Sequence, residues 1–143
     1  MRRLAEAHKE LGFLYRNLGR WDDADAAYRS ARDVLIQVTG PGSPEEIRTE
    51  MASIQANWAY IQALRGQYHQ ARNLVDSAIL VRRRLGQWRG AAMALSVSGE
   101  VHRYEQRYSL AWRAYQEAEA IFHELKSWPW LGQVFQQQAI CLH

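Results

Sequence analysis

An acidic run, Asp22, Asp23 and Asp25, is the first candidate for chemistry in this sequence, because clustered carboxylates can hold a cation. The run stands where a helical pattern begins. Carboxylates in the first turn of a helix also lie beside the positive end of the helix dipole, which stabilises them. We therefore interpret the run as helix-start charge and expect no metal site.

A basic run, Arg82, Arg83 and Arg84, is the second candidate, because guanidinium groups bind phosphate. The run falls at the predicted end of a helix, where positive charge offsets the helix dipole. The net charge is only +3, and no aromatic residues interleave the run, so the pattern typical of nucleic-acid binding is absent. We prefer the structural interpretation and expect no nucleic-acid partner.

Patterns typical of catalysis are not found. The one cysteine, Cys141, lies in an apolar stretch, as a small buried side chain would, and it excludes an internal disulfide. The histidines are too scattered to form a ligand pair, and no glycine-rich phosphate loop or nucleophile motif occurs. We therefore expect a protein that is not an enzyme and binds no cofactor. The five histidines are His8, His69, His102, His123 and His143.

The composition is ordinary for a globular chain. Of the 143 residues, 48% are hydrophobic and 23% are charged, so we expect no long disordered stretch. No segment has the roughly 18 consecutive apolar residues of a transmembrane helix, and the first residues lack the apolar core of a signal peptide. We expect a cytoplasmic protein with no membrane partner.

The sequence repeats itself with a period of 40 residues. Tyr68 and Tyr108 are 40 apart, and so are Trp88 and Trp128. The N-terminal part joins with an offset of 47, since Trp21 matches Tyr68. The excess falls in a linker rich in glycine and proline, 39–44, which is the clearest loop in the chain. Such periodicity is typical of a solenoid built from stacked repeats.

Apolar residues at steps of three and four predict helices throughout and no strand. In the first helix they are Leu4, Ala7, Leu11, Leu14 and Leu18, which lie on one face. The expected helices cover about 4–18, 22–35, 43–64, 68–85, 89–104 and 108–125, and a seventh runs from about 129 to the end.

Helix ends are marked by glycine and proline. Gly19 and Gly66 are expected to end the first and third helices. The third helix is expected to begin with Ser43 as its cap and Pro44 in its first turn, and Glu46 would complete a capping box.

These features resemble the tetratricopeptide repeat, whose consensus is similar to residues 11–24, LGFLYRNLGRWDDA, and to the later Tyr28. Small residues such as Gly12 and Ala24 let two antiparallel helices approach closely, and tyrosines fill the adjacent gaps. The resemblance implies an all-α, right-handed superhelix of three helix pairs plus one additional C-terminal helix. It would form one domain over 1–143, with repeats at about 3–38, 44–85 and 89–125 and a half repeat at 129–143.

The repeats depart from the common pattern in length and in a few residues. Gln62 stands where the family usually has Tyr, and Gln106 where it has Gly. The periods of 40 and 47 residues exceed the common 34. Longer repeats with a linker like Gly40–Pro44 are similar to those of kinesin light chains and of the sensor arms of bacterial STAND-type ATPases.

The family binds partners on the concave surface lined by the first helix of each pair, so the resemblance implies a protein or peptide in this groove. Aromatic, arginine and amide side chains suit such a surface. The family's clamp for chaperone C-termini is not expected, because Phe13 and Met93 stand where it needs Asn and Lys. The implied groove residues are Lys9, Phe13, Arg16, Asn17, Asn57, Tyr60, Glu100, Arg103, Tyr104, Gln133 and Gln136.

We therefore expect a non-enzymatic scaffold for protein–protein interactions, the sensor or interaction region of a larger bacterial signalling protein such as a STAND-type ATPase or a transcriptional regulator. One alternative is a regulatory domain that senses a peptide or a small ligand. A weaker one is a nucleic-acid-associated arm that uses Arg82–Arg84. The unpaired last helix would leave an apolar face uncovered, so we expect a part of a longer array or self-association through that helix.

Overall fold

The computed structural model describes residues 2–40 and 42–127, and in these residues the chain forms six α-helices and no strand. The prediction of an all-α chain is confirmed for this part. The predicted seventh helix and half repeat, from residue 129, lie outside the described residues. The helices are α1 (Arg2–Asn17), α2 (Trp21–Ile36), α3 (Glu45–Leu64), α4 (Tyr68–Arg84), α5 (Trp88–Tyr104) and α6 (Tyr108–Ser127).

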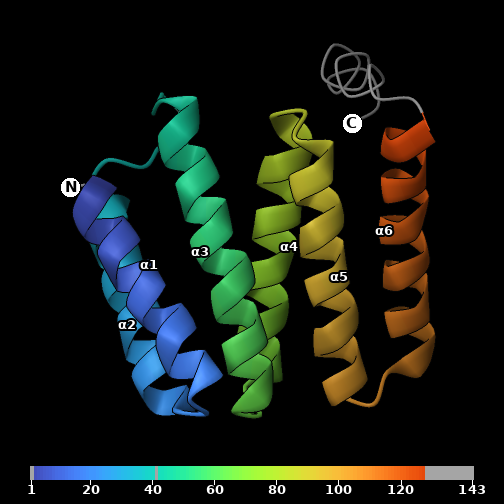
Figure 1. The fold of residues 1–143 in the computed structure, drawn as a ribbon, viewed down its shortest axis with the longest axis horizontal. Helices are drawn as coiled ribbons and strands as arrows, with labels where there is room; N and C mark the ends of the chain where they lie inside the picture. Colours follow the sequence, from blue (N-terminus) through green and yellow to red (C-terminus); the bar gives the residue numbers. More distant parts are fainter. Residues whose placement is uncertain (1, 41, 128–143) are drawn as a thin grey trace.

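The six helices are stacked side by side as three antiparallel pairs, α1–α2, α3–α4 and α5–α6 (Figure 1). The first helices of the pairs lie together, because α3 packs against both α1 and α5. In the described part of the chain, α2 and α4 have no close backbone contact. The first helices are therefore neighbours along the stack, whereas α2 and α4 are separated by α3, as in a solenoid.

Within two of the pairs, α1–α2 and α5–α6, the two helices meet through the same contact between a glycine and a tyrosine. A Cβ atom added to Gly12 in α1 would lie 2.7 Å from Cζ of Tyr28 in α2. A Cβ added to Gly99 in α5 would likewise lie 2.7 Å from Cε1 of Tyr115 in α6. At both places the tyrosine ring occupies the volume that a Cβ atom would need, and this confirms the predicted close approach at Gly12.

The hydroxyl of Tyr28 gives a test of this core. The side chain is 0% exposed, its hydroxyl has no hydrogen-bond partner in the described structure, and burial raises its pKa to about 12. Because the neutral phenol is favoured in the folded state, this group's contribution to stability is lost as the pH rises from about 10 to about 12.

We expect Tyr28→Phe to raise the free energy of unfolding at pH 7 by up to about 1 kcal/mol, since it removes an unsatisfied buried group. The change should also move the alkaline unfolding midpoint upward. Urea titrations followed by circular dichroism at pH 7 and pH 11 measure both effects. A variant less stable than the parent at both pH values would show that the hydroxyl has a partner.

Four of the five joints between helices share one turn geometry. The second residue after each of these helix ends has a left-handed backbone, with φ of 73° at Gly19, 79° at Gly66, 70° at Gly86 and 65° at Gln106. In each turn the following N–H donates to the carbonyl five residues earlier, at 2.8–2.9 Å. Gly19 and Gly66 end their helices as predicted. Gln106 keeps the same turn although a left-handed backbone costs a non-glycine residue about 1 kcal/mol.

The predicted capping box at the start of α3 is wrong. The helix begins at Glu45, Pro44 is its cap residue, and no side chain bonds the free N–H groups. The hydroxyl of Ser43 donates instead to the carbonyl oxygen of Gly40 at 2.7 Å, which closes a turn inside the linker. Ser43 is one residue too early in the chain, so Glu46 has no capping partner to reciprocate.

The apolar face predicted for the first helix exists, but it faces solvent. The core side of α1 is formed by small residues, Ala5 and Gly12. Two of the corresponding positions on α3, 47 residues later, are Met51 and Trp58, which are buried against α2. The exposed apolar face of α1 therefore corresponds to the face of α3 that α2 covers. Its large side chains and their exposed fractions are Leu4 (53%), Leu11 (42%), Leu14 (56%) and Leu18 (68%).

None of the six described helices combines the length and the apolarity that a membrane crossing requires.

Candidate functional site

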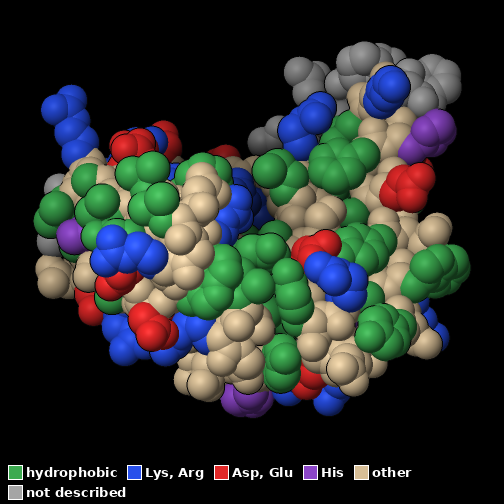
Figure 2. All heavy atoms as spheres, turned by 60° about the horizontal axis from the view of Figure 1, so that its bottom comes forward, with side chains coloured by type: hydrophobic (Ala, Val, Ile, Leu, Met, Phe, Trp, Pro, Cys, Tyr) green, Lys and Arg blue, Asp and Glu red, His purple; other side chains and the backbone are tan. Residues whose placement is uncertain are grey.

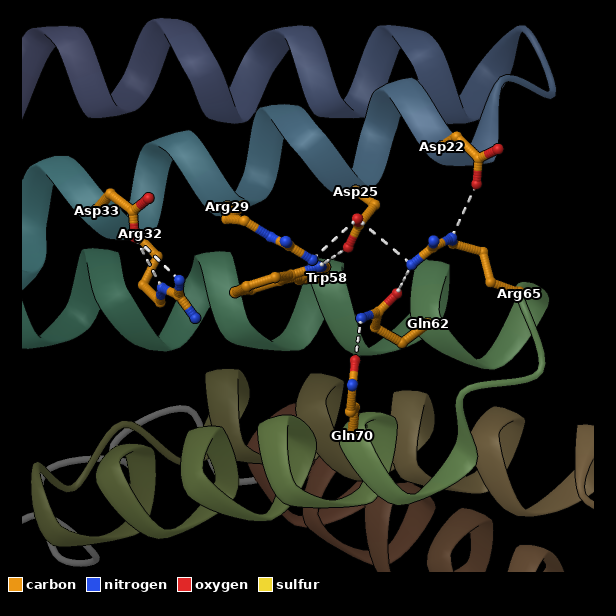
Figure 3. Close-up of polar contacts among 9 residues, drawn as sticks. All are labelled: Asp22, Asp25, Arg29, Arg32, Asp33, Trp58, Gln62, Arg65 and Gln70. Carbon is orange, nitrogen blue, oxygen red and sulfur yellow. Dashed lines mark hydrogen bonds and ion pairs between the residues drawn. The ribbon is translucent and has the colours of Figure 1, made fainter.

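The acidic run has a structural role that is only partly the predicted one. Asp22 and Asp23 lie in the first turn of α2, as expected of helix-start charge. Asp25, one turn further, is buried and accepts a hydrogen bond from Nε1–H of Trp58 in α3 at 2.8 Å (Figure 3). No group of metal-ligating side chains suitable for an ion is present within residues 2–40 and 42–127.

Two arginines complete the network around Asp25. The carboxylate lies 3.2 Å from the guanidinium of Arg29 and 3.3 Å from that of Arg65, which also bonds Asp22 at 3.0 Å (Figure 3). Because these groups come from α2 and from the end of α3, they join the first helix pair to the second. Gln62, the departure from the family's Tyr, is buried beside them and donates to Gln70 in α4 at 2.6 Å.

A cavity of about 370 Å³ opens beside this network, between α2 and α4, with Trp58 and Gln62 among its lining residues. Its two arginines are already paired with carboxylates, Arg29 with Asp25 and Arg32 with Asp33 at 2.9 Å. The cavity therefore presents little uncompensated charge to a ligand.

On the opposite side, the last turns of the first helices bring aromatic and arginine side chains into one row. The guanidinium carbon of Arg16 lies 4.6 Å from the ring centroid of Phe13 and 5.3 Å from that of Tyr60 in α3. The ring of Tyr60 meets that of Tyr104 in α5 edge to face, with centroids 6.1 Å apart. We call Phe13, Arg16, Tyr60, Arg103 and Tyr104 the aromatic–arginine row.

The row spans all three first helices. Arg103 continues it, with its guanidinium carbon 4.7 Å from the ring centroid of Tyr104. Cation–π contacts of this kind hold partly exposed rings in place at a gain of about 0.5–1 kcal/mol each. The space-filling view of Figure 2 shows hydrophobic side chains gathered over the middle of this end of the molecule, with basic and acidic side chains among them.

A carboxylate anchors the α5 end of the row. Glu100 accepts hydrogen bonds from the hydroxyl of Tyr115 at 2.5 Å and from Arg103 at 2.6 Å. Burial alone would raise the pKa of Glu100, but these two donors outweigh it and lower the pKa. The pKa of Tyr115 rises to about 12, because the hydroxyl is partly buried and donates to the carboxylate. At neutral pH, the carboxylate of Glu100 is therefore ionised and its oxygens already accept hydrogen bonds from Tyr115 and Arg103.

Towards the N-terminal end of α3, the surface of the first helices contains an arginine that sequence reasoning placed only at a helix end. Arg82 belongs to the last turn of α4, but its guanidinium reaches α3 and donates to Oγ of Ser53 at 2.6 Å. It also donates to Gln87 at 2.8 Å. A cavity of about 150 Å³ lies here, lined by Arg82 and by Ser53, Ala56, Asn57, Gly90, Met93, Ala94 and Val97.

The side chain of Arg82 fits between α3 and α5 because the facing residue on α5 is a glycine. A Cβ atom added to Gly90 in α5 would lie 2.9 Å from Cδ of Arg82. The eight-residue spacing between Arg82 and Gly90 is visible in the sequence. It points to this packing only once the turn between α4 and α5 is known.

Three further predicted groove residues lie in the described part of the chain, and they are Lys9, Asn17 and Asn57. Lys9 forms an ion pair with the buried Glu50 of α3 at 2.8 Å, so its charge is compensated. Asn17 is exposed at the end of α1, and Asn57 lines the cavity beside Arg82. Gln133 and Gln136 lie outside the described residues, as does the predicted C-terminal helix for which self-association was predicted.

The comparison with known families agrees with this geometry. Residues 10–45 match the tetratricopeptide repeat family. This segment is similar to a tetratricopeptide repeat. It covers the second half of α1, all of α2 and the linker, and the all-helical stack of the described residues is consistent with a tetratricopeptide solenoid. No curated protein and no solved structure matches the chain significantly. Tetratricopeptide repeats generally mediate protein interactions and are generally not enzymes, and the similarity to kinesin light chains and STAND-type ATPases stays a prediction.

Proposed function

We propose that this protein is a non-enzymatic interaction scaffold and that its groove of first helices binds a segment of a partner protein, with the aromatic–arginine row as the main contact. The observation that supports this most directly is the row itself, in which one tyrosine from each of α3 and α5 and one arginine from α1 share a partly exposed surface. Tyrosine and arginine are the side chains that most often dominate binding energy at protein interfaces.

The shape of the groove favours an extended segment over a small molecule. The cavity beside Arg82 has a volume of about 150 Å³, whereas pockets for drug-sized ligands are usually about 300–1,000 Å³. The row and this cavity follow each other along α3, so a chain segment can contact both.

We extend the proposal to the sensor or interaction region of a bacterial signalling protein, such as a STAND-type ATPase or a transcriptional regulator. The support is the linker between α2 and α3, whose sequence is similar to that of the linkers in the sensor arms of STAND-type ATPases. In this linker Ser43 and Gly40 form a closed turn. The full reading frame tests this extension. An ATPase or DNA-binding domain encoded with the repeats would support it, and a different kind of neighbouring domain would contradict it.

The binding role of the row is tested with peptides selected from a random library on the immobilised chain. We expect Tyr60→Ala to weaken the selected peptides at least about tenfold, because truncation of an interface tyrosine often removes 2 kcal/mol or more. Fluorescence anisotropy measures the dissociation constants.

Tyr108→Ala is the matched control, since Tyr108 is 65% exposed and belongs to α6. The control should bind like the parent chain. Equal losses in both variants, or unchanged binding in Tyr60→Ala, would show that the partner contacts another surface.

A further inference from the structure

Two arginines in the groove have no carboxylate partner in the described part of the chain. Within residues 2–40 and 42–127, the guanidinium of Arg82 donates only to neutral oxygens, those of Ser53 and Gln87. Arg16 stacks on Phe13 and Tyr60 and forms no hydrogen bond or ion pair with described residues. A guanidinium carries five N–H donors, so both groups retain donors for a ligand.

The other charges of the groove are already compensated. Lys9 is paired with Glu50 at 2.8 Å, and Arg103 with Glu100 at 2.6 Å. The field of Glu50 reaches Arg82, but burial dominates and lowers the pKa of this arginine. A partly buried guanidinium without a bonded carboxylate is stabilised when a carboxylate from a ligand approaches it.

The two arginines are spaced along one helix face. Arg82 contacts Ser53, and Arg16 contacts Tyr60, seven residues further along α3. Two helical turns separate these positions, about 10 Å along the axis. Asn57 lies between them on the same face and supplies an amide to bond a peptide backbone.

An extended peptide matches this spacing. In the polyproline II conformation, residues three apart lie on one side of the chain and about 9 Å apart. Next to Arg82, the side chains of Met93, which is 59% exposed, and Val97 offer an apolar surface to a neighbouring residue of the ligand.

We propose that the groove recognises an extended acidic segment of a partner protein, in which two carboxylates three residues apart reach Arg82 and Arg16. This inference rests on the proposed function and narrows it to one class of partner. The site differs from the clamp considered from the sequence, because it uses an arginine from a second helix and does not use Lys9.

The probe is a fluorescein-labelled, proline-rich peptide with two glutamates three positions apart. One comparison peptide carries glutamines at the same positions, and another carries adjacent glutamates. We expect the first peptide to bind about tenfold or more tightly than either, since charge-assisted bonds from arginine exceed neutral ones and the three-residue spacing matches the two helical turns between Ser53 and Tyr60.

Arg82→Gln and Arg16→Gln should each weaken the binding of the two-glutamate peptide about tenfold and leave the glutamine peptide unaffected. Arg84→Gln is the matched control, because it removes the same charge from an exposed position two residues from Arg82. Circular dichroism establishes that each variant is folded.

Gly90→Ala is a second test of Arg82, because it displaces the side chain without removing its positive charge. The added methyl group requires the Arg82 side chain to move, while alanine favours the helix of α5. We expect weaker binding of the two-glutamate peptide, by several fold, in a chain that is at least as stable as the parent.

Several results would overturn the proposal. They are equal affinities for the glutamate and glutamine peptides, no binding of the two-glutamate peptide at about 1 mM, equal losses in Arg84→Gln and Arg82→Gln, or a single-stranded oligonucleotide that binds more tightly through the same arginines. Library peptides without acidic residues that still depend on Tyr60 would overturn this inference and leave the interaction role of the groove intact.

Discussion

Replacement of Gly12 by alanine is expected to lower the free energy of unfolding by about 2 kcal/mol. The new methyl group would stand 2.7 Å from the ring of Tyr28, which is 0% exposed and enclosed by the core cluster of the first two helix pairs. Overpacking of this kind costs about 1–3 kcal/mol, and the better helix propensity of alanine returns less than 1 kcal/mol of it.

Gly99→Ala is the matched comparison, because its Cβ would meet Tyr115 at the same distance of 2.7 Å. Tyr115 is only half-buried and can rotate toward solvent, although it then loses its bond to Glu100. We therefore expect a smaller loss at Gly99. Urea titration followed by circular dichroism ranks the two variants, and a Gly12→Ala chain as stable as the parent would show that α1 and α2 are not packed this closely.

Replacement of Asp25 by alanine is expected to destabilise the chain by about 3 kcal/mol. The carboxylate is buried and bonds the indole N–H of Trp58 while it faces Arg29 and Arg65. Removal of one partner from a buried charge network typically costs about 3–5 kcal/mol, because the remaining groups stay desolvated without compensation. Arg65 keeps its pair with Asp22, which places the expected value at the lower end of the range.

Two further variants make this result specific. Asp23→Ala removes a carboxylate that, among the described residues, pairs only with the exposed Arg20, so a loss below about 1 kcal/mol is expected. Asp25→Asn keeps an oxygen for the indole N–H and should lie between the parent and Asp25→Ala. If the alanine variants at Asp23 and Asp25 unfold at the same urea concentration, then the network does not hold the two helix pairs together.

Local sequence signals were sufficient to predict the six helices of the described residues. Apolar spacing and the positions of Gly19 and Gly66 predicted the helix bounds closely, because helix formation and its termination by glycine depend on residues near one another. The wrong capping box at Ser43 also has a local cause. The serine hydroxyl has a nearer acceptor, the carbonyl oxygen of Gly40, and the sequence does not show which acceptor it takes.

The contacts between distant residues were not predictable in the same way. Asp25 meets Trp58 across 33 residues, and Arg82 reaches Ser53 across 29, so both contacts depend on how neighbouring pairs are placed. The family resemblance did select Arg16, Tyr60 and Tyr104, which the structure brings together in one row. Their role in binding remains a prediction.

The uneven joints have a mechanical consequence. From α3 to α6 every helix is tied to the next by the same short turn, whereas the connection from α2 to α3 spans residues 37–44. The joint between α2 and α3 is therefore expected to deform most easily, and the polar contacts of Asp25 hold the two helix pairs together across it. Under tension along the stack, the first pair would separate while the remaining four helices move as one body, and a widened groove between α1 and α3 would be the first effect on a bound partner.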